Sequence, residues 1–350
     1  MARNAQGQVG IEDSAVKLYF ILINAENEIL ILSPDQMPSQ ANRALPKGYQ
    51  LQNYKIAKQL SGGGFSIVYL AHDESGAAVA IKEYLPSQLA LREEGALVQA
   101  VTAENLATFR YGMKCFFEEG RALAKISHPN VVRVINFFRA NETVYMVMRY
   151  ERGKTMQEEI TSRKRVVKES FIRRVFAELL NGLREVHTHK ILHLDIKPAN
   201  VYIRLDGSPV LLDFGAARQT LTNEKSKLSP MYTPGFAAPE QYKNRDILGP
   251  WSDIYSVGAS MFSCLAGFAP QAADQRLSND KLASAKKLWE GQYSPQLLEI
   301  IDWCLQLNYM DRPQSVFHLQ KNLLEIVPLP PQKKPKLFDS IRQTLTKEIF

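Results

Sequence analysis

Residues 193–200 read HLDIKPAN, and three side chains in this stretch could act on a hydroxyl group beside a phosphate. Asp195 could accept the proton of the hydroxyl, and Lys197 could neutralise negative charge on a transferring phosphoryl group. Asn200 could hold a magnesium ion through its amide oxygen. Asp213 follows Asn200 by 13 residues, after two leucines of an expected buried strand, and its carboxylate suits the same ion. Each fragment alone is typical of a turn, but in this order they predict phosphoryl transfer.

A glycine-rich stretch, LSGGGFSIVY at residues 60–69, joins two expected strands. Small residues let backbone N–H groups approach phosphate oxygens closely, so the stretch is a candidate phosphate-binding loop. Taken alone, a glycine-rich hairpin is more often a simple turn.

Lys82 ends the apolar strand AVAIK and raises the question of its partner. An unpaired buried charge is costly, and Glu119 on the expected following helix is a suitable carboxylate. Such a pair could hold the lysine against nucleotide phosphates. The alternative is a lysine at the end of a strand that extends to water.

Strands and turns alternate from Tyr54 to about Ala80, and the period then changes. Apolar residues at 109, 113, 116, 117 and 123 predict a helix. Two more strands follow, and helices dominate from Lys168 onward, beginning with the amphipathic stretch 171–187. The sequence thus predicts a small β-rich half followed by a larger helical half.

Both ends of the chain carry segments of a different character. Residues 16–23 and 28–32 are β-rich runs that predict a hairpin, and residues 33–48 form a polar connector. Residues 328–336 read PLPPQKKPK, a Pro/Lys linker. Residues 337–350 have apolar residues at four-residue intervals, which predicts an amphipathic helix. This helix could pack on its own domain, or bind a partner or a membrane.

The composition is that of a globular protein, with 45% hydrophobic and 23% charged residues in 350. The net charge of +7 is mild for this length, and we expect no nucleic-acid partner. Cys115, Cys264 and Cys304 are too far apart for a CxxC pair. The polar N-terminus predicts no signal peptide, and the early apolar run at 18–23 is too short to be a transmembrane segment. These features predict a cytoplasmic protein.

From about Tyr54 to Val327 the chain resembles the eukaryotic-type (Hanks-type) Ser/Thr protein kinases, whose motif set includes a glycine loop, AIK, HxDxKPxN, DFG and APE. IKEYLPSQLALRE, FFEEGRALAKISHPNVVRV and TPGFAAPEQY are similar to bacterial members. The resemblance implies an α+β, bilobal fold. The implied domains are an N-terminal extension (1–48), a β-rich N-lobe (49–149), a mainly helical C-lobe (150–327) and a linker with an amphipathic helix (328–350).

The resemblance also implies roles for single residues. Asp195 orients the substrate hydroxyl and Lys197 stabilises the transferring phosphate, as the catalytic pair. Asn200 and Asp213 hold Mg²⁺, with Mn²⁺ as an alternative. Lys82 contacts the ATP phosphates and pairs with Glu119. The implied ATP-binding residues are Ser61, Gly62, Gly63, Gly64, Phe65, Ser66, Val68, Ala80, Lys82, Glu119, Met148, Arg149, Tyr150 and Glu151.

Four further residues are implied to support the site. Glu240 of the APE motif pairs with Arg312, and Asp253 hydrogen-bonds the backbone of the catalytic loop from a buried helix. Thr233 lies near the substrate hydroxyl, which favours serine or threonine over tyrosine. DIKPAN together with a full APE segment favours protein substrates over the small molecules used by related kinases. A metal site at His187 and His189 is disfavoured, because these residues end a helix.

Two departures from the family pattern bear on activity. Serines occupy the first and third positions of the glycine loop, at Ser61 and Ser66, so we expect weaker or slower use of ATP. Leu194 stands where the family has an arginine that meets a phosphate on the activation segment, so the chain is of the non-RD type. Activity is then not expected to require phosphorylation of segment 214–232, although that segment contains five hydroxyl residues.

The sequence therefore predicts a Ser/Thr protein kinase that transfers the γ-phosphate of ATP to protein hydroxyls and phosphorylates itself. The alternative is a pseudokinase that binds nucleotide as a scaffold or sensor, and a third reading is a small-molecule kinase of the same fold. Bacterial kinases of this kind often have a cognate protein phosphatase as a partner. The two terminal additions are expected to dock on the kinase lobes and to regulate them.

Overall fold

The structure is a computed structural model, which describes residues 42–92, 94–162, 167–214, 233–243 and 245–325, together with the backbone of 20–23 and 29–32. The expected amphipathic helix at 337–350, the Pro/Lys linker and the hydroxyl residues of the activation segment lie outside the described residues. The N-terminal hairpin is confirmed at the level of its strands, since β1 (Phe20–Ile23) pairs antiparallel with β2 (Ile29–Leu32).

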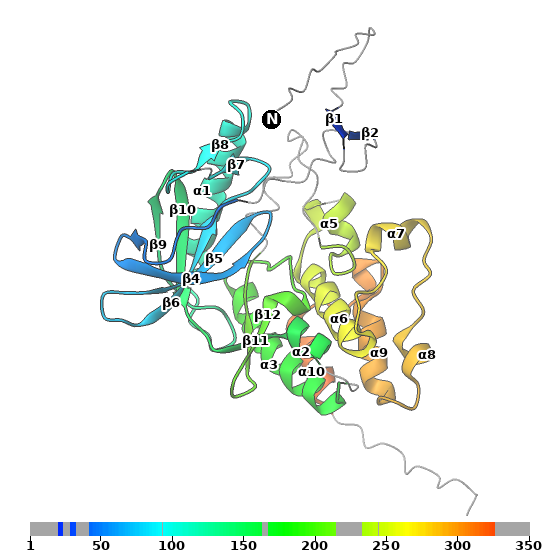
Figure 1. The fold of residues 1–350 in the computed structure, drawn as a ribbon. Helices are drawn as coiled ribbons and strands as arrows, with labels where there is room; N and C mark the ends of the chain where they lie inside the picture. Colours follow the sequence, from blue (N-terminus) through cyan, green and yellow to red (C-terminus); the bar gives the residue numbers. More distant parts are fainter. Residues whose placement is uncertain are drawn as a thin grey trace, which may run out of the picture.

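The N-lobe is built on a six-stranded antiparallel sheet, seen at the left of Figure 1. Its strands, in spatial order, are β3 (Gln50–Leu51), β4 (Tyr54–Gly62), β5 (Ser66–His72), β6 (Ala78–Tyr84), β10 (Thr143–Arg149) and β9 (Val134–Ala140). The central strands β6 and β10 are apolar and buried along most of their length, as expected for strands covered on both faces.

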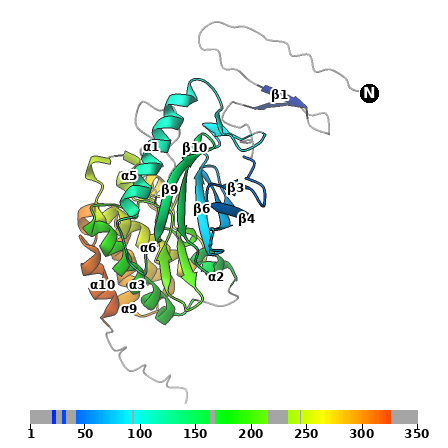
Figure 2. The ribbon, with the colours of Figure 1, turned by 90° about the vertical axis from the view of Figure 1, so that its left-hand side faces the viewer.

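A short insertion and one long helix complete this lobe. The insertion forms a two-stranded hairpin of β7 (Ala90–Leu91) and β8 (Gln99–Ala100). Helix α1 (Asn105–Leu123) follows it and lies alongside β9 and β10 (Figure 2). The predicted helical spacing is confirmed, because Phe109, Met113 and Phe116 are buried on one side of α1.

The C-lobe is mainly helical. Its helices are α2 (Met156–Ser162), α3 (Glu169–Thr188), α5 (Pro239–Lys243), α6 (Pro250–Ala266), α7 (Ala273–Ser278), α8 (Ala285–Trp289), α9 (Pro295–Cys304) and α10 (Val316–Leu324), with short 3₁₀ turns at η2 (Pro198–Asn200), η3 (Arg245–Ile247) and η4 (Tyr309–Asp311). A small antiparallel sheet lies at the junction of the lobes, with β11 (Gly153–Thr155), β12 (Val201–Arg204) and β13 (Pro209–Leu211).

Helix α6 is the centre of the C-lobe. Thirteen consecutive residues, 252–264, are buried in it, so the helix is enclosed on all sides and not amphipathic. The left-handed Gly267 (φ +81°) ends it, a conformation that costs glycine little. The α+β, bilobal fold predicted from the sequence is confirmed.

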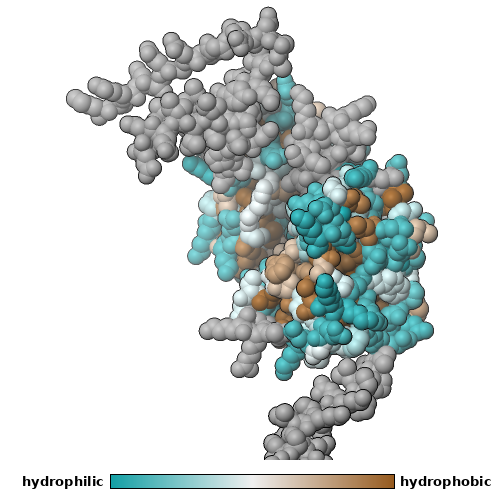
Figure 3. All heavy atoms as spheres, turned by 90° about the vertical axis from the view of Figure 1, so that its right-hand side faces the viewer, coloured by the Kyte–Doolittle hydropathy of each residue, from teal (hydrophilic) through white to brown (hydrophobic). Residues whose placement is uncertain are grey.

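The outer face of the C-lobe, on the side of α7 and α8, is mostly polar, with apolar residues in separate patches (Figure 3). Among the residues that the structure describes, no helix combines the length and the apolar character needed to cross a bilayer.

Candidate active site

The catalytic loop, residues 193–200, is anchored by Asp253, which is fully buried in α6. Its carboxylate accepts the backbone N–H of His193 at 2.9 Å and that of Leu194 at 2.7 Å. Nε2 of His187, in the last turn of α3, lies 2.8 Å from the same carboxylate, so this histidine also supports the loop. Burial works to raise the pKa of Asp253, but the hydrogen bond and charge of His187 hold the pKa below its usual value. The predicted role of Asp253 is confirmed.

Leu194 has a left-handed backbone (φ +61°), which is unfavourable for a residue with a branched side chain. Two contacts hold it there: its N–H donates to Asp253, and its carbonyl accepts from Nε2 of Gln241 at 2.9 Å. Gln241 belongs to α5, which follows the segment expected to meet the substrate. The catalytic loop is therefore joined to α5 by a direct hydrogen bond, without an arginine at position 194.

Asp195, Lys197, Asn200 and Thr233 form one hydrogen-bonded cluster. The hydroxyl of Thr233 donates to Oδ1 of Asp195 at 2.8 Å, and Nζ of Lys197 lies 2.7 Å from the same hydroxyl. Lys197 also pairs with Asp195 at 3.0 Å. The amide nitrogen of Asn200 donates to the Asp195 backbone and carboxylate, both at 2.9 Å, which orients this side chain. The cluster brings the two predicted catalytic residues and the predicted threonine together.

Lys82 is buried at 3% exposure and does not extend to water. Its Nζ forms an ion pair with Oδ1 of Asp213 at 2.9 Å. Glu119, the partner that the sequence predicted for this lysine, is also buried, on α1. Asp213 reaches the lysine from a left-handed backbone (φ +51°), a conformation that its position after a strand did not indicate.

A cleft of about 430 Å³ lies between the lobes. The predicted site residues that line it are Ser61, Val68, Ala80, Met148, Arg149, Tyr150, Glu151 and Asp213. The sequence analysis missed eight others, namely Leu60, Val132, Gly153, Thr155, Glu158, Ala199, Tyr202 and Leu212. Tyr202 and Leu212 had a signal, because each is within two residues of a predicted metal ligand and on an expected strand. Val132 had no such signal in the sequence, because only the packing of the folded chain brings it to the cleft.

The glycine loop places its residues in two groups. Ser61 lines the cleft, and Gly62 to Gly64 are exposed at the tip of the β4–β5 hairpin. Phe65 and Ser66 are buried at 4% and 8% exposure, and the Phe65 ring meets Tyr84 edge-on at 5.1 Å. Phe65 is thus part of the N-lobe core. The two serines that depart from the family pattern therefore lie in different surroundings.

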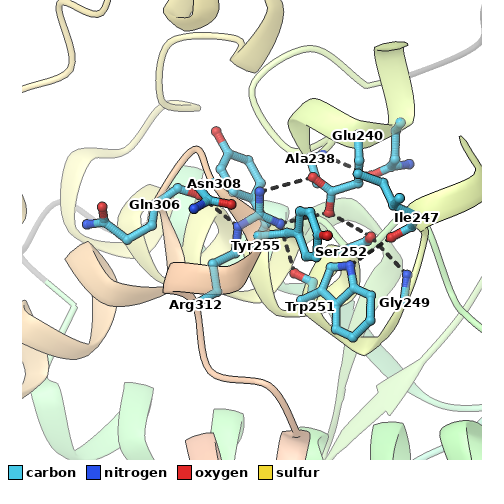
Figure 4. A network of polar contacts seen from close by, with 12 residues as sticks. Ala238, Glu240, Ile247, Gly249, Trp251, Ser252, Tyr255, Gln306, Asn308 and Arg312 are labelled. Carbon is cyan, nitrogen blue, oxygen red and sulfur yellow. Dashed lines mark hydrogen bonds and ion pairs between the residues drawn. The ribbon is translucent and has the colours of Figure 1, made fainter. Parts of the chain in front are cut away.

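Arg312 and Glu240 form the predicted ion pair, which is confirmed and completely buried (Figure 4). The guanidinium donates to the two carboxylate oxygens at 2.8 and 3.0 Å, a bidentate geometry. Ser252 donates a further bond to Glu240 at 2.7 Å, and the Tyr255 ring lies 4.9 Å from the arginine. The pair fixes the segment around α5 to the C-terminal part of the lobe.

A family model for the protein kinase domain matches residues 54–324. The chain belongs to the protein kinase family. This kinase domain is 26% identical over 275 residues to Serine/threonine-protein kinase B of Synechocystis sp., covering 75% of this chain and 44% of that protein. It is 27% identical over 291 residues to Serine/threonine-protein kinase PknA of Nostoc sp., covering 79% of this chain and 47% of that protein. The chain thus spans less than half the length of these relatives.

Solved structures agree with the family. The apo form of PpkA-294 matches this kinase domain with a TM-score of 0.74 and 34% identity, over 80% of this chain and 99% of that one. The kinase domain of PknI from M. tuberculosis matches at 19% identity with a TM-score of 0.60, over 80% of this chain and 98% of that one. The second match supports the fold alone. The resemblance found in the sequence is confirmed.

The segment that joins β10 to β11 is fixed to the small interlobe sheet. Glu151 of this segment, predicted to bind ATP, accepts two hydrogen bonds from Arg204 of β12, at 2.8 and 2.9 Å. Gly153 follows closely, and a Cβ built there would lie 2.0 Å from the carbonyl oxygen of Ile203. Only glycine allows β11 to approach β12 so closely at the mouth of the cleft.

Proposed function

We propose that this chain is an active Ser/Thr protein kinase that uses ATP and a divalent cation. The observation that carries the proposal is the cluster of Asp195, Lys197 and Thr233 together with the Lys82–Asp213 pair at the cleft. A scaffold that only binds nucleotide has no need of a carboxylate beside a hydroxyl and a lysine. Membership of the family and the names of the curated relatives support the same activity.

The cleft residues suit a nucleotide. Val68, Ala80, Met148 and Leu212 offer apolar surface for a flat ring. Lys82 supplies a buried positive charge for the phosphates. Asn200 uses its amide nitrogen for Asp195, which leaves its oxygen as a ligand, and Asp213 supplies a carboxylate. Two such oxygen ligands suit Mg²⁺, which keeps several waters and is bound through few protein groups.

In the proposed reaction, the oxygen of a substrate serine or threonine attacks the γ-phosphorus of ATP. The bond to the β–γ bridging oxygen breaks, and ADP leaves with that electron pair. Asp195 orients the hydroxyl and accepts its proton. Its Oδ1 already accepts a hydrogen bond from the hydroxyl of Thr233 in this structure. Lys197 neutralises charge on the transferring group. Mg²⁺ held by Asn200 and Asp213 would neutralise the phosphates of the nucleotide.

Three finer points belong to this proposal. Mg²⁺ is the metal expected in preference to Mn²⁺. The protein acts in the cytoplasm, a reducing compartment that suits the free thiols of Cys115, Cys264 and Cys304. A cognate protein phosphatase reverses its phosphorylation.

The test is transfer of labelled phosphate from ATP with Mg²⁺ to the protein itself and to a generic basic protein. Asp195→Asn and Asp213→Ala run beside the wild type. Label in the wild type alone, released as phosphoserine or phosphothreonine on hydrolysis, supports the proposal. Absence of label in every sample, with nucleotide still raising the melting temperature, would favour the pseudokinase. Transfer to small alcohols but not to proteins would favour a small-molecule kinase.

A further inference from the structure

A buried charge network fixes the insertion between β6 and α1 to the N-lobe sheet. Arg92 is 3% exposed and forms a bidentate ion pair with Glu83, which is fully buried. The hydroxyl of Tyr69 donates to the same carboxylate at 2.7 Å, and Tyr145 donates to its other oxygen. The remaining donors of Arg92 reach the carbonyls of Ala96 and Arg43, each at 3.0 Å. The arginine therefore joins the insertion to the N-terminal arm.

The same contacts fix the point where the N-terminal extension leaves the kinase domain. Asn42 donates to the Ala90 carbonyl at 3.1 Å and accepts the N–H of Arg92 at 2.9 Å. The chain before Asn42 thus begins beside β7. Nine residues, 33–41, separate this point from strand β2. At about 3.3–3.6 Å for each extended residue, they allow β2 to lie anywhere within roughly 30 Å.

A groove of about 720 Å³ lies within that reach, between the insertion, α1 and the turn from β9 to β10. Its buried apolar floor is Val98, Phe109 and Met113. At its edge Leu106 is 37% exposed. The groove is continuous with a smaller hollow of about 230 Å³ along α1, because both are lined by Arg110, Met113 and Arg139.

The two hollows carry a basic rim over this apolar floor. Three exposed cations, Arg110, Lys114 and Arg139, line them, against the single carboxylate of Glu142. The part of the N-terminal extension around the hairpin has the opposite charge. Residues 11–35 contain five acidic residues and one lysine, and the loop between β1 and β2 reads NAENE. Residues 11–35 and the rim of the groove are therefore complementary in charge.

The hairpin itself needs a covering surface. All eight residues of β1 and β2 are apolar, and the two strands pair in register from Phe20↔Leu32 to Ile23↔Ile29. Successive residues of a strand alternate between its faces, so both faces of this hairpin are apolar. An isolated two-stranded hairpin is only marginally stable in water. A hairpin that is apolar on both faces and has no covering partner also leaves apolar surface in contact with water.

We propose that residues 16–32 dock in the groove formed by the insertion and α1 of the same chain. In this proposal the apolar strands cover the floor, and the negative charge of Glu26 and Glu28 complements the basic rim. Because Phe116 of α1 has its ring 5.8 Å from Nζ of Lys82, an occupied groove restrains the helix that packs beside this lysine. This consequence for activity rests on the proposed kinase function, whereas the docking itself does not.

The docking is tested by the reactivity of a thiol placed at the edge of the groove. Leu106→Cys is made in a Cys115→Ser background, in the full chain and in a chain that lacks residues 1–32. The maleimide labelling rate should be at least about tenfold slower in the full chain, because the hairpin covers the position. Leu205→Cys, at a turn that is 81% exposed in the native chain, is the matched control and should label equally fast in both. Equal rates at position 106 in both chains would overturn the docking.

Two further variants separate this occupant from others. Arg110→Glu should speed labelling of the full chain, and adding Glu26→Arg with Glu28→Arg should restore the slow rate. Arg121→Glu, on α1 but with its side chain 63% exposed outside the groove, should change nothing. Protection that disappears on dilution would show a second copy in the groove, and protection lost on deleting residues 326–350 would show the C-terminal segment. Either result contradicts the proposal. Thiol labelling does not depend on turnover of ATP. The docking proposal can therefore be refuted while the kinase proposal stands, and the kinase proposal can be refuted while the docking proposal stands.

Discussion

The Nζ of Lys82, on β6 of the N-lobe, lies 2.9 Å from Oδ1 of Asp213, which follows β13 of the C-lobe. This contact joins the two lobes across the cleft through the two charged groups proposed to handle phosphate and metal. We predict that Lys82→Met and Asp213→Asn each lower turnover by about 100-fold or more, because each removes charge stabilisation that the reaction needs. Initial rates with saturating ATP measure this. Lys286→Met, which breaks an exposed pair with Glu299, is the control and should keep wild-type rates. Near-normal turnover in either cleft variant would contradict the assigned roles.

Gln241 should matter more for activity than phosphorylation of the activation segment. It holds the strained Leu194 by a hydrogen bond to the Leu194 carbonyl, so Gln241→Ala should lower turnover by about tenfold. Replacing the hydroxyl residues Thr220, Thr222, Ser226, Ser229 and Tyr232 by alanine, or phenylalanine for the tyrosine, should leave most activity. Rates on an external substrate decide. A loss of most activity in the five-residue variant would show that a phosphate there is required after all.

The Arg312–Glu240 pair should contribute strongly to stability. Both side chains are buried, so Arg312→Met alone leaves an uncompensated carboxylate and should lower the free energy of unfolding by about 3–5 kcal/mol. Adding Glu240→Leu removes that carboxylate and should recover part of the loss. Urea unfolding of the two variants and the wild type measures this. A double variant less stable than Arg312→Met would refute the explanation.

The buried His193 should make the folded protein less stable in mild acid. Burial lowers its pKa below the ordinary value, and the neutral ring lies 2.9 Å from the Leu212 carbonyl through Nε2 and accepts the N–H of Asp195 at Nδ1. At about pH 6.5 and below, His193 therefore binds a proton more readily in the unfolded chain than in the folded protein. Stability should be unaffected by this group above that pH and fall below it. Unfolding midpoints between pH 8 and 5 measure the slope, and His193→Phe should flatten it. An unchanged slope in that variant would assign the loss to other groups.

The two serines of the glycine loop should differ in their effect on ATP. Ser61 lines the cleft, whereas Ser66 is buried beside the core residue Phe65. Ser61→Gly should therefore lower the KM for ATP by a few-fold, and Ser66→Gly should leave it unchanged while costing about 1 kcal/mol for glycine within a strand. Steady-state kinetics and thermal unfolding of the two single variants measure this. The reverse order of effects on KM would show that the buried serine shapes the pocket.

The sequence alone determined the family and the two-lobed fold, and it predicted the residues that are proposed to act in the reaction. This was possible because phosphoryl transfer needs a few residue types in a fixed chain order, and HLDIKPAN, the lysine strand and the APE segment are each contiguous. Hydrophobic spacing likewise located α1, since a helix with one buried face leaves a periodic pattern. The supporting pairs around Glu240 and Asp253 could be predicted only through the resemblance, because their partners are distant in sequence.

Only the tertiary structure decided how these residues meet. Lys82 pairs with Asp213, 131 positions away, which adopts an unusual backbone conformation that no local pattern indicates. Phe65 belongs to the core because the β4–β5 hairpin turns it toward Tyr84. No sequence motif indicated the ion pair of Glu83 and Arg92. Arg92 also donates to the carbonyl of Arg43, so this network fixes the position at which the N-terminal extension leaves the N-lobe. Such contacts depend on the packing of segments remote in the chain, and only the folded structure supplies that information.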